Sequence, residues 1–148
     1  MTEFQETIKA RVLALSSRAL SEEERAVMAN LWSNYDKGKV TQLQIARSER
    51  WMGCHPKHEA DIRSNKMETT TRQVRQIIRD LRVKWEVPII SDVKGYWIVT
   101  SQEEAQEYLN RLEVEAKAQI KSWIETSRAM ARALNMQNSF FTNLEAEL

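Results

Sequence analysis

The segment from Thr70 to Val99 constrains the fold more than any other, because a strongly patterned helix runs directly into a hairpin. Apolar side chains recur there at the spacing of one helix face, namely Val74, Ile77, Ile78 and Leu81. An advance of about 100° per residue puts polar side chains on the opposite face: Arg72, Arg75, Gln76 and Arg79, with Arg82 at its edge. The pattern predicts an amphipathic helix with a positively charged outer face.

Signals for both ends of this helix are also present. Thr71 is a candidate N-cap, because its hydroxyl can accept a hydrogen bond from an amide of the first turn. The helix is expected to end near Trp85, since the residue before Pro88 prefers an extended backbone. Two β-rich runs follow, residues 88–91 and 96–99, and the intervening residues 92–95 include a glycine. This spacing predicts a short β-hairpin.

An arginine-faced helix followed at once by a hairpin resembles the second half of a winged helix-turn-helix domain, most closely the N-terminal type of biotin-operon repressors. The recognition helix of that type has the form T-x-R-x-V-x-x-x-I-x-x-L-R, and its wing ends in a Gly-Tyr-aromatic or Gly-Tyr-Arg run. The matching residues are Thr70, Arg72, Val74, Ile78, Leu81 and Arg82 in the helix and Gly95–Ile98 in the wing. Small phage and mobile-element winged-helix proteins are similar. The resemblance covers roughly residues 21–99 and implies a mainly α fold with a small β-hairpin wing.

The residues before this segment predict three more helices. The first covers Thr2–Ala19, and we assign residues 1–20 to an N-terminal helical extension. The second begins at the capping box Ser21–Glu24 and ends near Tyr35, with Gly38 as a suitable C-terminal cap. A short third helix starts at Thr41. Residues 21–99 are therefore expected to form the winged helix-turn-helix domain.

Residues 47–68 depart from the family pattern, in which three or four residues precede the recognition helix. We expect an inserted loop or a broken short helix here. The insertion contains Cys54, His55 and His58, whose sulfur and imidazole groups are the ligand types of zinc. The sequence has no second Cys or His pair to complete a tetrahedral site, so we predict a plain surface loop, no metal and no cofactor.

Residues 100–148 are dominated by one long helix, which opens at a capping box from Ser101 to Glu104 and runs to about Leu134. Its apolar residues recur every 3.5 residues on average, the period of a coiled coil. The helix would be roughly 50 Å long, against about 30 Å for a small domain, so it needs a further partner. The N-terminal helix of the same chain and a second subunit are the alternatives. We predict a homodimer through Leu109, Leu112, Ala116, Ile120, Trp123 and Met130.

Composition adds limits on the cellular setting. The net charge of +1 neither supports nor excludes nucleic acid, so the local positive face is the informative feature. One cysteine precludes an intrachain disulfide and suits a reducing cytosol. The first residues lack the pattern of a signal peptide, and no apolar run approaches the length of a membrane span. A cytoplasmic protein without a membrane partner is expected.

The arginine-rich face predicts a protein that binds double-stranded DNA. Arg pairs with guanine edges and with phosphates, and Gln pairs with adenine. The expected DNA-binding residues are Thr70, Thr71, Arg72, Arg75, Gln76, Arg79, Arg82 and Lys94. Of these, Arg72, Arg75 and Gln76 should reach base edges, and Arg79, Arg82 and Lys94 should hold phosphates. The plain alternative is an ordinary solvated helix face.

The predicted function is therefore sequence-selective DNA binding, as a phage or mobile-element regulator of transcription or replication. The alternative is a protein–protein interaction module that uses the winged helix as a scaffold in a replication or host-takeover complex. An enzyme is not expected, because the sequence has no phosphate-binding glycine loop, no metal-ligand quartet and no recognisable pair of buried carboxylates. Trp97 on the wing is expected to pack in the core or in an interface, and the alternative is that it stacks on a base or on a partner.

Overall fold

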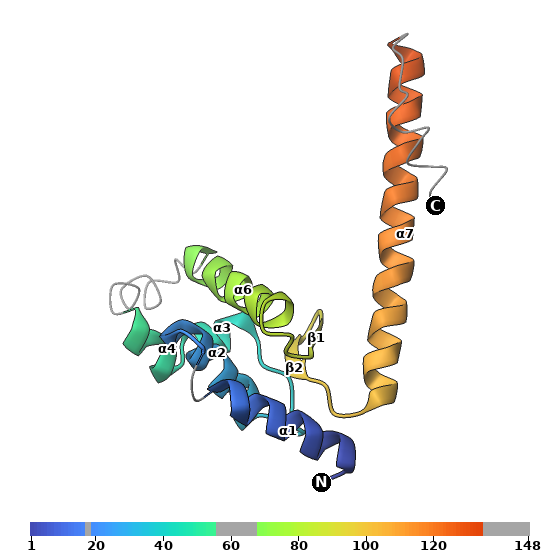
Figure 1. Cartoon of the computed structure of the whole chain (residues 1–148). Coiled ribbons are helices and arrows are strands. Elements are labelled where there is room, and N and C mark those ends of the chain that lie inside the picture. Colours follow the sequence, from blue (N-terminus) through green and yellow to red (C-terminus); the bar gives the residue numbers. More distant parts are fainter. Residues whose placement is uncertain (17–18, 56–67, 135–148) are drawn as a thin grey trace. The chain divides into compact units, whose positions relative to one another are not determined.

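The computed structural model describes residues 1–16, 19–55 and 68–134 (Figure 1). The chain divides into two units, and we call the first of them, residues 1–105, the head. The fold is mainly α with one β-hairpin, an N-terminal helix and a long C-terminal helix, as predicted. The described elements are α1 (Glu3–Ser16), α2 (Glu22–Ser33), α3 (Gln42–Ala46), α4 (Glu49–Cys54), α6 (Glu68–Val83), β1 (Ile89–Asp92), β2 (Gly95–Ile98) and α7 (Gln102–Ala133).

The predicted capping box of α2 is confirmed. The Glu24 amide donates to Ser21 Oγ at 3.2 Å, and the Ser21 amide donates to Glu24 Oε1 at 3.0 Å. The helix buries Ala26, Val27, Met28 and Leu31 on one face. Its C-terminal cap is Asn34, and the left-handed residue that follows is Asp36, with φ of 59°. The prediction of Gly38 as the cap was wrong, because the helix ends one turn earlier.

The first part of the predicted insertion belongs to the core. Ser48 caps α4 by accepting a hydrogen bond from the Trp51 amide at 3.3 Å. The Trp51 side chain is 0% exposed, and Figure 1 shows α4 beside α2 and α3, which it contacts. Of the two alternatives, an inserted loop or a broken short helix, the structure shows a short helix for Glu49–Cys54, and its buried tryptophan makes it part of the core. Residues 56–67 of the insertion lie outside the described residues.

The helix α6 begins earlier than expected. Its first residue is Glu68, so Thr71 lies inside the helix and the prediction of Thr71 as the N-cap was wrong. The predicted apolar face is confirmed, because Val74, Ile78 and Leu81 are buried against the other elements of the head. This face contacts α2 and α3. The helix is thereby held by one side, and its polar side is left to solvent.

The hairpin pairs β1 with β2 in antiparallel register, from Ile89 opposite Ile98 to Asp92 opposite Gly95. The turn is thus the two residues 93–94, shorter than the four expected. Val40 forms an isolated antiparallel bridge to the hairpin, since its amide and carbonyl exchange two hydrogen bonds of 2.8 Å with Tyr96. The order α2, Val40, α3, α6, β1, β2 is compatible with a winged-helix layout.

Gly95 is the residue that allows this close strand contact. Its φ is +147°, and a Cβ atom placed on it would lie 2.8 Å from the Val40 carbonyl oxygen. Side chains rarely adopt that backbone conformation, and the oxygen is held by its own hydrogen bond. A glycine is therefore required where the hairpin meets Val40.

The N-terminal helix α1 packs on the head rather than standing apart from it. It buries Ile8 and Val12, and Arg11 donates to the Glu86 carbonyl at 3.1 Å and to its carboxylate at 2.9 Å. Gln5 donates to the Thr100 carbonyl at 3.3 Å. These contacts attach α1 to the two loops that flank the hairpin.

The long helix α7 covers 32 residues, about 48 Å at 1.5 Å per residue. Its first turn is capped by Ser101, whose hydroxyl accepts from the Glu104 amide at 3.1 Å. The Glu104 carboxylate accepts from the Thr100 amide at 3.0 Å, so the predicted reciprocal bond to Ser101 is replaced by one to its neighbour. Among the described residues, no helix is long and apolar enough to cross a bilayer.

Candidate nucleic-acid interface

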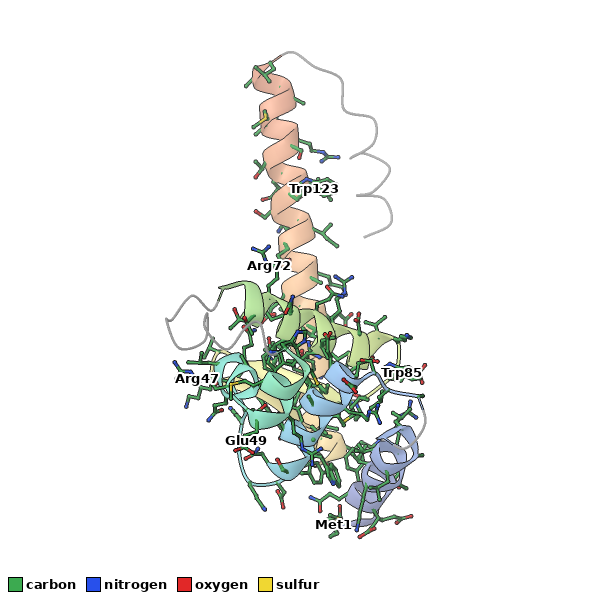
Figure 2. All side chains as sticks on the ribbon, turned by 90° about the vertical axis from the view of Figure 1, so that its left-hand side faces the viewer. Met1, Arg47, Glu49, Arg72, Trp85 and Trp123 are labelled. Carbon is green, nitrogen blue, oxygen red and sulfur yellow. The ribbon has the colours of Figure 1, made fainter. Side chains whose placement is uncertain are left out.

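The outer face of α6 is a cluster of exposed polar side chains, which we call the arginine face: Arg72, Arg75, Gln76 and Arg79. Figure 2 shows Arg72 on the ribbon of α6. Arg75 and Arg79 make no ion pair with any described residue. Gln76 donates to Asp80 Oδ1 at 3.0 Å across one helical turn. The helix therefore presents a concentrated positive charge opposite its buried stripe.

Arg82 does not belong to this face, although we expected it to hold a phosphate. Its Nε donates to the Ile89 carbonyl at 2.8 Å and its Nη2 donates to Ser91 Oγ at 3.1 Å. The guanidinium carbon also lies 5.7 Å from the centre of the Tyr96 ring. These contacts engage Nε and Nη2 of the guanidinium group, so Arg82 connects the end of α6 to the hairpin.

The two threonines predicted to bind DNA have different surroundings. Thr70 is 1% exposed, and it lies four residues before Val74 on the buried stripe. Its hydroxyl is not accessible, so the structure contradicts its placement in the interface. Thr71 is half-buried and lines a groove beside the hairpin.

That groove is open, has a volume of about 350 Å³ and connects three elements. The start of α3, Thr71 of α6 and the hairpin turn form its walls, with the lining residues Thr41, Gln42, Leu43, Thr71 and Asp92–Tyr96. Gln42 Nε2 donates to the Tyr96 hydroxyl at 2.7 Å across it. The sequence analysis missed Gln42 and Leu43, because no spacing pattern indicates that the start of α3 lies beside the hairpin. The pairing of Val40 with Tyr96 places it there.

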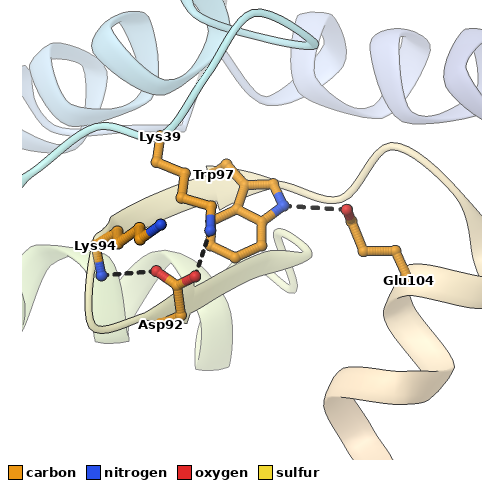
Figure 3. A network of polar contacts seen from close by, with 5 residues as sticks. All are labelled: Lys39, Asp92, Lys94, Trp97 and Glu104. Atoms are coloured by element: carbon orange, nitrogen blue, oxygen red, sulfur yellow. Dashed lines mark hydrogen bonds and ion pairs between the residues drawn. The ribbon is translucent and has the colours of Figure 1, made fainter.

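The hairpin turn is fixed by a polar network, which Figure 3 shows from close by. Asp92 Oδ1 accepts from the Lys94 amide at 2.7 Å, and Oδ2 makes an ion pair with Lys39 Nζ. The hydrogen bond from Lys39 is the main reason that the pKa of Asp92 is lowered. The Lys94 side chain is exposed at the tip of the turn, as the predicted phosphate contact requires.

Trp97 is held from two sides, and this bears on the alternative of base stacking. Lys39 Nζ lies 4.5 Å from the centre of the indole ring, and the indole N–H donates to Glu104 Oε1 at 3.1 Å. Figure 3 shows this chain of contacts from Asp92 to the first turn of α7. One face and the polar edge of the ring are thus occupied, which disfavours stacking on a base. The contacts of Trp97 with Lys39 and Glu104 were not foreseen, because they join residues of different elements.

The described residues contain no group of three or more His, Cys, Asp or Glu side chains arranged to hold a metal ion. Burial, followed by the charges of Glu22 and Glu23, raises the pKa of the Cys54 thiol and makes it a poorer ligand. His55 lies 3.3 Å from Glu23 and stacks at 4.6 Å on Trp51. The third residue of the predicted cluster, at position 58, lies outside the described residues.

The comparisons with known proteins add no relative to this geometry: no protein-family model, no curated protein and no solved structure matches the chain.

Proposed function

We propose that this chain binds double-stranded DNA selectively, with α6 in the major groove and the β1–β2 hairpin as a wing beside it. The observation that carries the proposal is the arginine face, where the exposed guanidinium groups of Arg75 and Arg79 make no ion pair with any described residue and the helix is anchored by its opposite side. An α-helix fits the major groove of B-DNA, and guanidinium groups suit both guanine edges and phosphates. The order of elements, which is compatible with a winged helix, supports this docking mode.

The exposed side chains divide into two roles along α6. Arg72, Arg75 and Gln76 lie nearer the N-terminal end of α6 than Arg79 and are assigned to base edges. Arg79, one turn later, and Lys94 on the wing are assigned to phosphates. Such a protein would act by binding rather than by catalysis, as a regulator of transcription or replication in the cytoplasm.

A protein-interaction role has separate support from α7. The single chain leaves several of its apolar side chains exposed, among them Leu109 (57%), Trp123 (47%) and Met130 (60%). We assign this surface to pairing with a second copy of the chain, so that the dimer presents two DNA-binding heads. Each head of such a dimer can bind DNA, which makes the two roles compatible.

The first experiment titrates the full-length protein with random-sequence duplex DNA at two salt concentrations. A DNA-binding protein loses affinity steeply with salt, because each phosphate contact releases counterions. The double variant Arg75→Ala/Arg79→Ala should bind more weakly and reduce the log–log salt slope by at least about one unit. Circular dichroism should show it folded, since both side chains are on the exposed face.

A matched control removes two other exposed guanidinium groups, by Arg25→Ala on α2 and Arg50→Ala on α4. It changes the net charge equally, so it separates the arginine face from a general loss of positive charge. The control should bind like the parent protein. Equal affinities of the parent and the folded Arg75/Arg79 variant would rule out this docking mode and favour the interaction-module alternative.

Selection of duplexes from a random pool then separates the two roles. Arg75→Ala should relax the preference at one base position, at a cost of about 1–3 kcal/mol on the preferred sequence. Arg79→Ala should weaken binding to all sequences alike.

A further inference from the structure

The charges of α7 are segregated along its axis. Its first half, residues 102–116, contains five glutamates and one arginine, and its second half, residues 117–133, contains four lysines or arginines and one glutamate. Several of these charges also pair within the helix, as Lys117 Nζ does with Glu113 Oε1 at 2.9 Å. The net charge nevertheless changes sign near the middle of the helix. Two such helices are complementary in charge only when they run in opposite directions.

The exposed apolar stripe lies on one side of α7 across this change of sign. Leu109, Leu112 and Ala116 belong to the acidic half, while Trp123 and Met130 belong to the basic half, and all five are exposed. Ile120 is half-buried, whereas Ile124, at the edge of the stripe, is buried within the single chain and does not belong to the exposed surface. A covering helix would therefore meet apolar contacts along most of the length of α7.

We propose that two copies of this chain pair antiparallel through α7, and that the dimer thereby holds two DNA segments apart. The claim that the dimer holds two DNA segments rests on the proposed function. The claim that the two helices pair antiparallel rests on α7 alone. In the antiparallel arrangement each acidic half lies beside the basic half of the other copy. In the parallel arrangement acidic halves lie side by side, as do basic halves, and both repel. Opposed helix dipoles favour the same arrangement.

With full overlap the centre of the pair lies between residues 117 and 118, so that Leu112 lies level with Trp123 of the second copy. Near the centre Ala116 lies level with Gln119 of the second copy. The small alanine at this level leaves room for the longer glutamine, and larger apolar side chains meet on both sides of it.

The functional consequence follows from connectivity. Each head joins α7 at its N-terminal end, so antiparallel pairing puts the two attachment points at opposite ends of the pair, about 48 Å apart. Half-sites of a dimer with adjacent heads are typically spaced by one helical turn, about 34 Å. The antiparallel dimer is instead suited to binding two separate duplexes, one with each head.

Spin-label distances in the full-length protein test the direction of pairing. In a Cys54→Ser background, single cysteines replace Glu107, Lys117 or Arg132, all of which are exposed. Antiparallel pairing with full overlap predicts axial separations of roughly 30 Å at position 107, 45 Å at position 132, and a contact of about 10 Å at position 117. Short distances at all three positions would show a parallel dimer and overturn the proposal. A monomer by sedimentation at high concentration would overturn it equally, and would leave the stripe to a different protein.

Charge reversal gives a second, independent test. Lys121→Glu with Arg132→Glu makes the second half of α7 acidic. The dissociation constant of an antiparallel dimer should therefore rise, so that the variant is a monomer at concentrations at which the parent protein is a dimer. A parallel dimer should instead be maintained or strengthened, because repulsion between the basic halves disappears. The control Lys121→Arg/Arg132→Lys keeps the charge and should leave the dimer unchanged. The antiparallel dimer should also weaken with salt, since charges on exposed helix faces are screened beyond about 10 Å at 0.1 M.

The bridging role is tested with two duplexes of different length, one attached to beads and one labelled in solution. The dimer should retain the labelled duplex on the beads, and the Lys121/Arg132 charge-reversal variant should not. A dimer that binds DNA but retains no second duplex would overturn bridging. Because the spin-label distances need no DNA, antiparallel pairing stands even if direct titration shows no DNA binding, and the two failures are distinguishable.

Discussion

The sharpest test of the structure contrasts two arginines of α6 that lie three residues apart. Arg82 makes hydrogen bonds of 2.8 Å and 3.1 Å to β1, whereas Arg79 makes none with any described residue. A hydrogen bond from a charged donor contributes about 1.5–3 kcal/mol, and partial exposure of the Arg82 side chain puts its two bonds at the lower end. We therefore expect Arg82→Ala to lower the free energy of unfolding by about 2–3 kcal/mol.

For a head of this size, such a loss should lower the unfolding midpoint by roughly 10–20 °C. Thermal unfolding followed by circular dichroism measures it, and Arg79→Ala serves as the control with an unchanged midpoint. Equal midpoints for the two variants would refute the reasoning. If Arg82→Ala also reduced the salt slope of DNA binding without a change in stability, Arg82 would be the phosphate contact that the sequence suggested.

Two further predictions concern the inside of the head. The Glu24 carboxylate accepts from the Trp85 indole at 2.6 Å, and although burial alone would raise its pKa, the Ser21 and Trp85 hydrogen bonds lower it. A lowered pKa contributes stability that is complete above the ordinary pKa of glutamate and is lost as the pH falls through the pKa of the folded state. Trp85→Phe should therefore lower the free energy of unfolding at pH 7 by about 1.5–3 kcal/mol. The difference in urea midpoints between the variant and the parent should become smaller in acid. Gly95→Ala places a Cβ 2.8 Å from the Val40 carbonyl oxygen, so we expect a loss of about 1–3 kcal/mol, and an unaltered urea midpoint would contradict that steric argument.

Local signals in the sequence predicted the local structure well. The spacing of Val74, Ile78 and Leu81 identified the buried side of α6, and Ser21 identified the start of α2. These features depend on residues within one or two helical turns of each other, and periodicity and capping report such contacts directly. The burial of Thr70 was also open to prediction, because it precedes Val74 by one i, i+4 step.

Contacts between distant segments were not predictable in this way. The role of Arg82 depends on where β1 passes, and the role of Lys39 depends on its nearness to Trp97, more than fifty residues later. Trp51 looked like part of a loop because its surrounding residues are polar, yet its side chain fills the space beside α2. The assignment of the arginine face to DNA stays a prediction, since fold alone does not specify function.

The strand contact at Val40 has a consequence for how the head folds. Its pairing with Tyr96 closes a loop of chain that contains α3, α4 and α6, so this contact forms late and at a high entropic cost. The β1–β2 turn itself is local and forms without that cost. Val40 thus joins the hairpin only when the helices between them have assembled, and we expect the loss of this bridge and the unfolding of α6 to be one cooperative event.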